Sequence, residues 1–178
     1  MIKTISLEWL QSKGACKESL EAWQKETDHD TFTTLRRLVV KNPEWGNWLI
    51  CRIMNKNQSV QYAIFAAEQV IDIYEGKYPD DKRPRNAIEA AKAYLQNPSK
   101  KTKDYACAAY AAAYTAAYTT YAAYAAAYAA SATAATAAAA ADYAAAYTAA
   151  AVAVADADER RKMKAKILKY GIGLLEQS

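Results

Sequence analysis

Residues 105–128 read YACAAYAAAYTAAYTTYAAYAAAY, and this alanine–tyrosine stretch decides the fold class. Alanine has the highest helix propensity of the amino acids, and residues 99–170 contain no glycine or proline to interrupt a helix. Tyrosines recur here at intervals of three or four residues, which places them on one arc of about 120° around a helix. These tyrosines are Tyr110, Tyr114, Tyr118, Tyr121, Tyr124 and Tyr128. The pattern predicts an all-α protein.

The alanine–tyrosine tract is too long to be a single helix of a small protein. One helix over residues 99–170 would extend about 108 Å at 1.5 Å per residue. Short polar side chains favour caps and turns, so we expect breaks at Ser131 and Thr133, or at Asp142. Two or three helices would then fold back on one another. We expect Asp156 or Asp158 to cap a last helix.

The first hundred residues predict short amphipathic helices with distinct ends. Ser6 is an expected N-cap for a helix that Gly14 ends, because glycine tolerates the left-handed conformation of a helix terminus. Asp30 is the expected N-cap of a later helix. Asn42 followed by Pro43 combines a capping side chain with the residue favoured at the first helical position.

A longer apolar stripe follows in the same half of the chain. Residues 60–74 carry apolar side chains at helical spacing, which predicts one helix ended by Gly76. A further helix is expected to end at Asn97, since the residue before Pro98 avoids the α region. We therefore divide the chain into residues 1–98, with short amphipathic helices, and residues 99–178, with long alanine/tyrosine-rich helices and a basic C-terminal helix. Both are expected to pack into one compact multi-helix bundle.

The charge distribution disfavours nucleic acid as a partner. The chain carries 23 basic and 19 acidic residues, for a net charge of +4, and residues 105–155 contain one charged side chain, Asp142. A protein that neutralises a phosphate backbone normally has a larger basic excess. A membrane span is disfavoured too, because residues 105–141 combine alanine with thirteen Tyr, Thr or Ser residues and no strongly apolar aliphatic side chain.

The cysteine and histidine content limits which disulfide, metal or catalytic sites the chain can form. Cys16, Cys51 and Cys107 are widely spaced and His29 is the only histidine, so neither a disulfide framework nor a zinc site is expected. We expect buried free thiols, no metal and no cofactor. The chain has no nucleophile elbow, phosphate loop or metalloprotease motif, so we expect no enzyme. Its N-terminus lacks the apolar run of a signal peptide, which predicts a cytoplasmic protein.

Three roles are open for the alanine–tyrosine tract. The favoured one is structural: alanine faces let helices approach closely, and the tyrosine stripe adds buried area. A second is a tyrosine-lined groove that stacks on a ligand or partner, since tyrosine offers rigid, amphipathic contact area. A third is ice binding, although the threonines show no sustained 11-residue period.

Two groups of residues are the candidate partner-binding site. One is the charged segment with Asp81, Arg83 and Arg85, which lies where loops often carry function. Its structural alternative is a helix start pinned by an aspartate–arginine ion pair. The other group is the middle of the tyrosine arc, and it consists of Tyr114, Tyr118 and Tyr121.

Several segments resemble the alanine-rich immunity proteins of bacteria, which also occur in phage genomes. The segments are LQSKGACKESLEAW (10–23), NPEWGNWLICRIM (42–54) and AIFAAEQVIDIYEGKYPDDKRPRNAIEAAKAYL (63–95), the last leading directly into the tract. The most specific motif is Tyr78-Pro79-Asp80-Asp81 with Arg83-Pro84-Arg85. Relatives in that family carry scattered charged residues in the tract, whereas this chain is nearly uncharged there. The resemblance implies an all-helical fold and the neutralisation of a toxin or other partner protein.

These observations give one leading hypothesis and two alternatives. The leading hypothesis is a non-catalytic helical protein that binds a partner protein, as an immunity or counter-defence factor, with self-association through the alanine-rich helices as a further expectation. The first alternative is a small-molecule or nucleotide binder with a tyrosine-lined pocket and Arg83 or Arg85 as an anion anchor. The second is an ice-binding or purely structural helical protein.

Overall fold

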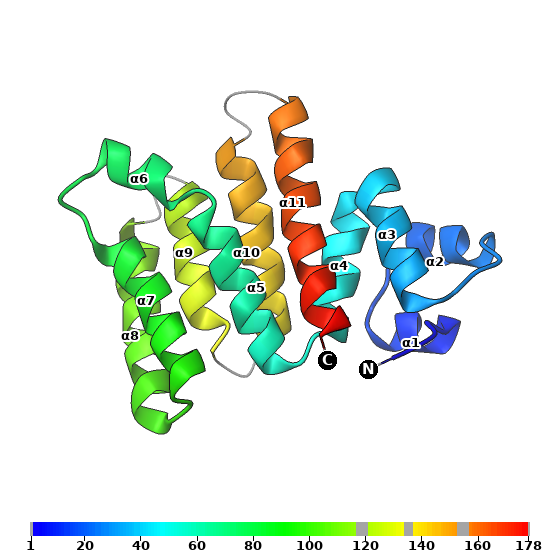
Figure 1. The fold of residues 1–178 in the computed structure, drawn as a ribbon, viewed down its shortest axis with the longest axis horizontal. Coiled ribbons are helices and arrows are strands. Elements are labelled where there is room, and N and C mark those ends of the chain that lie inside the picture. The colour runs from blue at the N-terminus through cyan, green and yellow to red at the C-terminus, as the bar shows by residue number, and fades with distance from the viewer. Residues whose placement is uncertain (1, 117–120, 134–136, 153–156, 178) are drawn as a thin grey trace.

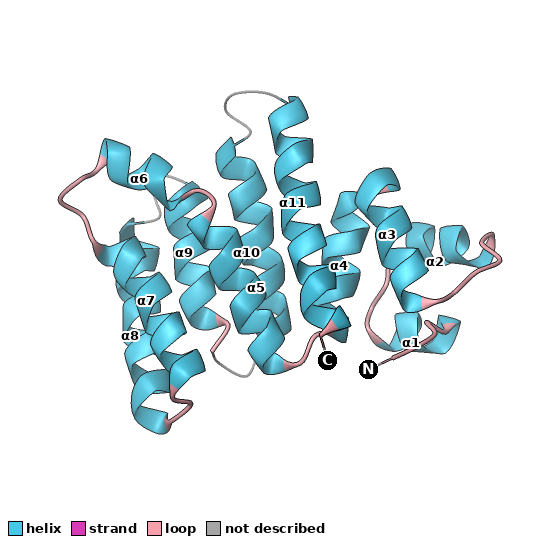
Figure 2. Cartoon of the chain, viewed as in Figure 1, coloured by secondary structure: helices cyan, strands magenta, loops and turns pink. Residues whose placement is uncertain are grey.

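A computed structural model describes residues 2–116, 121–133, 137–152 and 157–177. These residues form eleven helices and no strand, so the predicted all-α class is confirmed (Figures 1 and 2). One isolated bridge joins Thr4 and Asp30. The helices are α1 (Leu7–Ser12), α2 (Lys17–Gln24), α3 (Thr31–Lys41), α4 (Pro43–Ile53), α5 (Lys56–Glu68), α6 (Ile71–Lys77), α7 (Arg83–Gln96), α8 (Lys100–Ala116), α9 (Tyr121–Ser131), α10 (Ala137–Val152) and α11 (Ala157–Glu176).

Eight of these helices form two stacked layers. The first layer contains α7, α5, α11 and α3, each packed against the next, and the second contains α8, α9, α10 and α4 in the same manner (Figure 1). Helices of one layer also pack across onto the other, as α5 does onto α9 and α10. The order in space differs from the order in the chain, because α11 returns to lie between α5 and α3. Helix α6 packs on α9 and α5 at one end of the array.

The N-terminal helices begin and end where the sequence predicts. The side chains of Ser6, Asp30 and Asn42 each accept a hydrogen bond from the backbone N–H three residues on, which satisfies a donor that the first helical turn leaves unpaired. Pro43 occupies the first turn of α4. Gly14 has a φ of +75°, the left-handed conformation that a helix terminus requires. These caps were fully predictable because they depend on local sequence.

One predicted helix is two helices in the structure, so the prediction of a single element over residues 60–76 is wrong. The apolar stripe is divided between α5 and α6, and Gly76 lies inside α6 and does not end a helix. The backbone leaves helical geometry at Val70, with φ −133° and ψ −1°. Val70 and Ile71 are both buried, and the change of direction lets both side chains enter the core. Burial therefore overrides the periodic pattern.

The alanine–tyrosine tract forms α8, α9 and α10, which pack side by side in chain order. Helix α9 ends at Ser131, as predicted. A break at Asp142 is a wrong prediction, because Asp142 lies within α10. Of the two residues expected to cap the last helix, Asp158 lies inside the first turn of α11, so that alternative is wrong. Asp156 falls outside the described residues.

Alanine builds the core on this side of the molecule. The buried alanines of α9 and α10 are fully or almost fully shielded from solvent, and they are Ala125, Ala126, Ala127, Ala129, Ala130, Ala137, Ala140, Ala141, Ala144 and Ala145. A methyl group buries little area, but it lets neighbouring backbones approach closely enough to pack without voids. The core around α11 uses large side chains instead, among them Tyr62, Ile50 and Leu168.

Candidate interaction surface

Five tyrosine rings from three adjacent helices gather into one cluster. Tyr128 of α9 is central, with its ring centroid 5.0 Å from that of Tyr143 and 5.5 Å from that of Tyr147, both on α10. The Tyr110 ring of α8 lies 6.3 Å from Tyr128, and the Tyr121 ring lies 6.1 Å from Tyr147. These spacings fall in the range of attractive aromatic pairs. We call these five residues the tyrosine surface.

The prediction that the tyrosine stripe supplies buried area is confirmed for part of this cluster, because Tyr110, Tyr128 and Tyr147 pack against core residues. Tyr121 is 49% exposed and Tyr143 is 52% exposed, while the other three rings are half-buried. The core-facing positions beside them are alanines such as Ala126 and Ala129, which are 0% exposed. The rings therefore lie along the outer edge of the alanine contacts, where a tyrosine can bury one side of its ring and expose the other.

The one charged residue of the tract, Asp142, pairs with α4. Its carboxylate lies 3.1 Å from the Arg52 guanidinium and also accepts a hydrogen bond from the Asn47 amide. The Tyr62 hydroxyl donates to Asn47 at 2.7 Å, and burial raises the pKa of Tyr62 well above its usual value. Burial raises the pKa of the neighbouring Cys51 thiol as well. Asp142, the residue directly before Tyr143 of the tyrosine surface, is thus already paired with α4.

The predicted charged segment forms a compact ion pair at the connection between α6 and α7. The Asp81 carboxylate accepts hydrogen bonds from the Arg83 guanidinium at 2.6 and 2.9 Å and from the Tyr74 hydroxyl at 2.7 Å. The Arg83 guanidinium holds the pKa of Asp81 well below its usual range. Since Tyr74 is buried, these bonds attach the connection to the core. This geometry matches the structural alternative, a helix start pinned by an ion pair.

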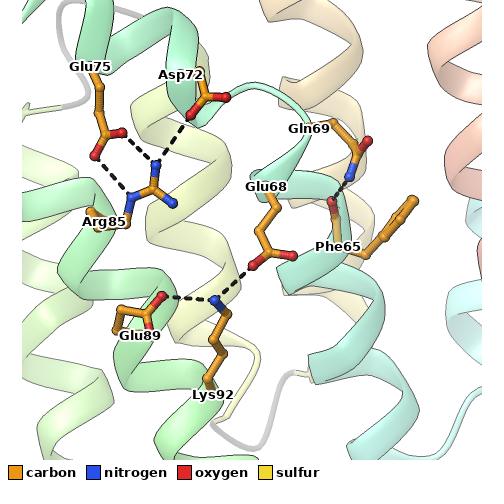
Figure 3. A network of polar contacts seen from close by, with 8 residues as sticks. All are labelled: Phe65, Glu68, Gln69, Asp72, Glu75, Arg85, Glu89 and Lys92. Atoms are coloured by element: carbon orange, nitrogen blue, oxygen red, sulfur yellow. Dashed lines mark hydrogen bonds and ion pairs between the residues drawn. The ribbon is translucent and has the colours of Figure 1, made fainter.

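Two further cations of α7 hold neighbouring helices: Arg85 pairs with α6 and Lys92 pairs with α5 (Figure 3). The Arg85 guanidinium contacts Glu75, with one bond at 3.0 Å, and Asp72 at 3.3 Å. The hydrogen bond from Arg85 lowers the pKa of Glu75. Lys92 of α7 lies 2.8 Å from Glu68 of α5 and 2.8 Å from a carboxylate one turn earlier in α7. Each of the two cations drawn in Figure 3 therefore contacts two carboxylates.

The structure brings some of the predicted site residues together and separates others. Asp81, Arg83 and Arg85 lie together on the segment from α6 to α7, and α6 packs on α9, the helix that carries Tyr121. Tyr121 belongs to the tyrosine surface. Tyr114 lies in α8, but its side chain is outside the described part, and Tyr118 is outside the described residues altogether.

Of the five members of the tyrosine surface, only Tyr121 is among the residues that the sequence predicts for the site. Tyr110, Tyr128, Tyr143 and Tyr147 are not. Tyr143 and Tyr147 show the i, i+4 spacing of one helix face, which is a visible signal. Their contact with Tyr128 depends on α9 and α10 lying side by side, and nothing in the spacing within either helix indicates that.

Within the described residues, no group of three His, Cys, Asp or Glu side chains could hold a metal ion. None of the described helices combines the length and the apolar character needed to cross a bilayer. The three cysteines are free, as expected, but only Cys51 is buried, so the prediction of burial is wrong for Cys16 and Cys107, which are exposed.

These features define a class of protein: an all-helical, alanine-rich array whose most distinctive site is an exposed aromatic surface. The chain belongs to the family described as "Imm-5 like putative immunity protein", which matches residues 49–170. The match covers α5 to α10 together with parts of α4 and α11, and therefore includes both the tyrosine surface and the α6–α7 ion pair. No curated protein and no solved structure matches the chain.

Proposed function

We propose that this protein is a non-catalytic immunity or counter-defence factor that binds and neutralises a partner protein through the tyrosine surface. The observation that carries the proposal is the cluster of five tyrosine rings from three adjacent helices, in which Tyr121 and Tyr143 are half-exposed and the other three rings are partly buried. Membership of an immunity-protein family supports a protein as the partner.

Tyrosine suits this task for physical reasons. Its ring offers a large contact area with only two side-chain torsions to immobilise, and its hydroxyl can donate or accept a hydrogen bond. Ring–ring contacts at 5.0 to 6.4 Å restrict these torsions further before a partner arrives. Binding therefore loses less conformational entropy than it would on a surface of lysines or glutamates.

Tyr128 and Tyr143 are the members that we expect to contribute most. Tyr128 is central and contacts rings from both neighbouring helices, while Tyr143 is half-exposed. Central aromatic residues of an interface commonly contribute the largest share of the binding free energy.

The charged segment around Asp81 has a supporting position in this proposal. Arg83 is paired with Asp81, and Arg85 with Glu75 and Asp72, which argues against either arginine as an anchor for a small anion. We propose that the segment holds α6 in place beside α9 and so borders the partner at the Tyr121 end of the surface.

The proposal is tested by isolating the partner and comparing single variants. Tagged wild-type protein is used to capture partners from native host cells, and each captured protein is purified and titrated calorimetrically. Tyr128→Ala and Tyr143→Ala should each weaken binding by about tenfold or more. If the partner is toxic when expressed, wild-type protein should restore growth and these variants should restore it less.

Tyr105→Ala is the matched control. Tyr105 lies on α8 and is 53% exposed, close to the 52% of Tyr143, but it is not a member of the tyrosine surface. Its replacement should change the affinity less than about threefold. A partner that binds Tyr128→Ala and Tyr143→Ala as tightly as wild type would exclude this surface as the binding site.

A further inference from the structure

A pocket of about 540 Å³ lies among the N-terminal helices, on a different part of the molecule from the tyrosine surface. Residues of α1, α2, α3 and α4 line it, together with Asp142 of α10. Apart from Leu49 and Asp142, its lining residues lie upstream of the segment that matches the immunity-protein family. The proposed partner-binding function makes no use of it.

The walls of this pocket are aromatic and apolar. Three of the four tryptophans, Trp23, Trp45 and Trp48, line it, and leucine and isoleucine side chains complete the apolar part. The volume falls within the range of about 300–1,000 Å³ that is typical of sites for small organic ligands. Several indole rings around one space favour a ligand with a flat aromatic face, since stacked rings attract one another beyond the burial of their area.

The charged residues of the lining are already paired. Glu26 lies 2.8 Å from Arg37 and 3.7 Å from Lys41, and all three line the pocket. Glu44 pairs with a lysine of α11, and Asp142 pairs with Arg52. A charged ligand could pair with a lining residue only by displacing that residue's present ion-pair partner. The lining therefore favours a neutral ligand over an organic cation or anion.

Two polar atoms of lining residues still lack partners within the described part of the chain. They are the indole Nε1 of Trp23 and the hydroxyl oxygen of Thr34, and both are buried. Trp23 stacks on His29 with ring centroids 3.9 Å apart, which fixes one face of the indole. A buried N–H without an acceptor is costly, so a ligand acceptor that reaches it after the covering side chains move would be favoured.

We propose that this pocket binds a neutral, planar, fused-ring aromatic compound that carries a hydrogen-bond acceptor. The indoles of Trp45 and Trp48 contact its faces or edges, and the acceptor takes the hydrogen bond that Trp23 offers. Thr34 provides a second polar contact.

Two probes with one ring skeleton test both parts of this proposal. N-methylacridone is neutral and has a carbonyl acceptor, whereas N-methylacridinium is cationic and has none. Each is titrated into full-length protein labelled with ¹⁵N at tryptophan, so that the indole N–H signals of Trp9, Trp23, Trp45 and Trp48 are followed separately. N-methylacridone should shift the signals of the three lining tryptophans saturably, while that of Trp9, which does not line the pocket, stays in place.

Variants separate a direct contact from a structural effect. Trp23→Phe should weaken N-methylacridone binding roughly tenfold, because it removes the N–H donor and keeps an aromatic ring. Thr34→Val, which keeps the side-chain shape, should weaken it less, and Trp9→Phe should leave it unchanged. Circular dichroism and the melting temperature confirm that each variant is folded. The proposal fails if no saturable shift occurs, if N-methylacridinium binds as tightly, or if folded Trp23→Phe binds with unchanged affinity.

Discussion

Gly171 shows how one missing side chain sets the distance between helices. A Cβ atom at this position of α11 would lie 2.6 Å from a ring carbon of Tyr62 and 2.7 Å from a methyl carbon of Ile50. Both neighbours are fully buried, and the Tyr62 hydroxyl is held by Asn47, so neither can move freely. The close approach of α11 to α5 and α4 therefore depends on glycine at this position.

Gly171→Ala should lower the free energy of unfolding. Overpacking in a rigid core typically costs about 1–3 kcal/mol, and the higher helix propensity of alanine returns up to about 1 kcal/mol, so a net loss of about 1–2 kcal/mol is expected. Equilibrium unfolding in urea measures it.

Gly173 supplies the matched control two residues further along the same helix. No atom lies within 4 Å of a Cβ placed there. Gly173→Ala should therefore raise stability by up to about 1 kcal/mol through helix propensity alone. Equal stability of the two variants would mean that the packing at Gly171 has no energetic consequence.

At the scale of the elements, the connection between α6 and α7 is held by the ion pair between Asp81 and Arg83. Asp81 accepts hydrogen bonds from Arg83 and Tyr74, and the pairing with Arg83 depresses the pKa of Asp81 in the folded protein. A depressed pKa contributes stability above the unfolded pKa of about 4, and that contribution is lost as the pH falls from there toward the folded value. The α6 region should therefore loosen in acid before the apolar core does.

Asp81→Asn tests this expectation through its pH dependence. At pH 6 the variant should be less stable than wild type by about 1–2 kcal/mol, the usual worth of hydrogen bonds to a charged group at a partly exposed site. The difference should shrink as the pH falls below about 4, because the wild-type carboxylate is progressively protonated. Urea unfolding at several pH values measures the difference.

Asp80→Asn is the control for this experiment, since Asp80 is an exposed carboxylate on the same connection. It should change stability by less than about 0.5 kcal/mol at every pH. A stability difference between Asp81→Asn and wild type that stays constant from pH 6 to pH 3 would contradict the proposed role of the ion pair.

For the whole molecule, the interleaving of distant helices has a thermodynamic consequence. Helix α11, from the C-terminal part of the chain, packs against α3, α4 and α5 from the N-terminal part as well as against α10. Loss of α11 would expose the core side chains around Ile50, Tyr62 and Leu168. We therefore expect residues 1–98 and 99–178 to unfold together.

Differential scanning calorimetry tests this cooperativity. One transition is expected, with a calorimetric enthalpy equal to the van't Hoff enthalpy. A fragment of residues 1–98 should lack a cooperative transition, because it leaves the faces of α3, α4 and α5 that contact α11 and α10 uncovered. Two resolved transitions in the full chain would show instead that its two parts are independent folding units.

The sequence by itself determined the fold class and several helix ends in this protein. Alanine propensity made the tract helical, and the caps at Ser6, Asp30 and Asn42 lie within three residues of the N–H groups that they satisfy. Such features are local, so periodicity and cap chemistry are sufficient to predict them. The pairing of Asp81 with Arg83, two residues apart, was within reach for the same reason.

Only the tertiary structure decided which face of the tract is core. A helix of alanine and tyrosine can bury either kind of face. Close packing of α8, α9 and α10 puts alanines at the centre of the core and tyrosine rings at its edge, where Tyr121 and Tyr143 are exposed. The break before α6, the pairing of Asp142 with α4 and the tryptophan pocket likewise depend on residues far apart in the chain. These are consequences of helix-to-helix contact, which the spacing of residues within one helix does not encode.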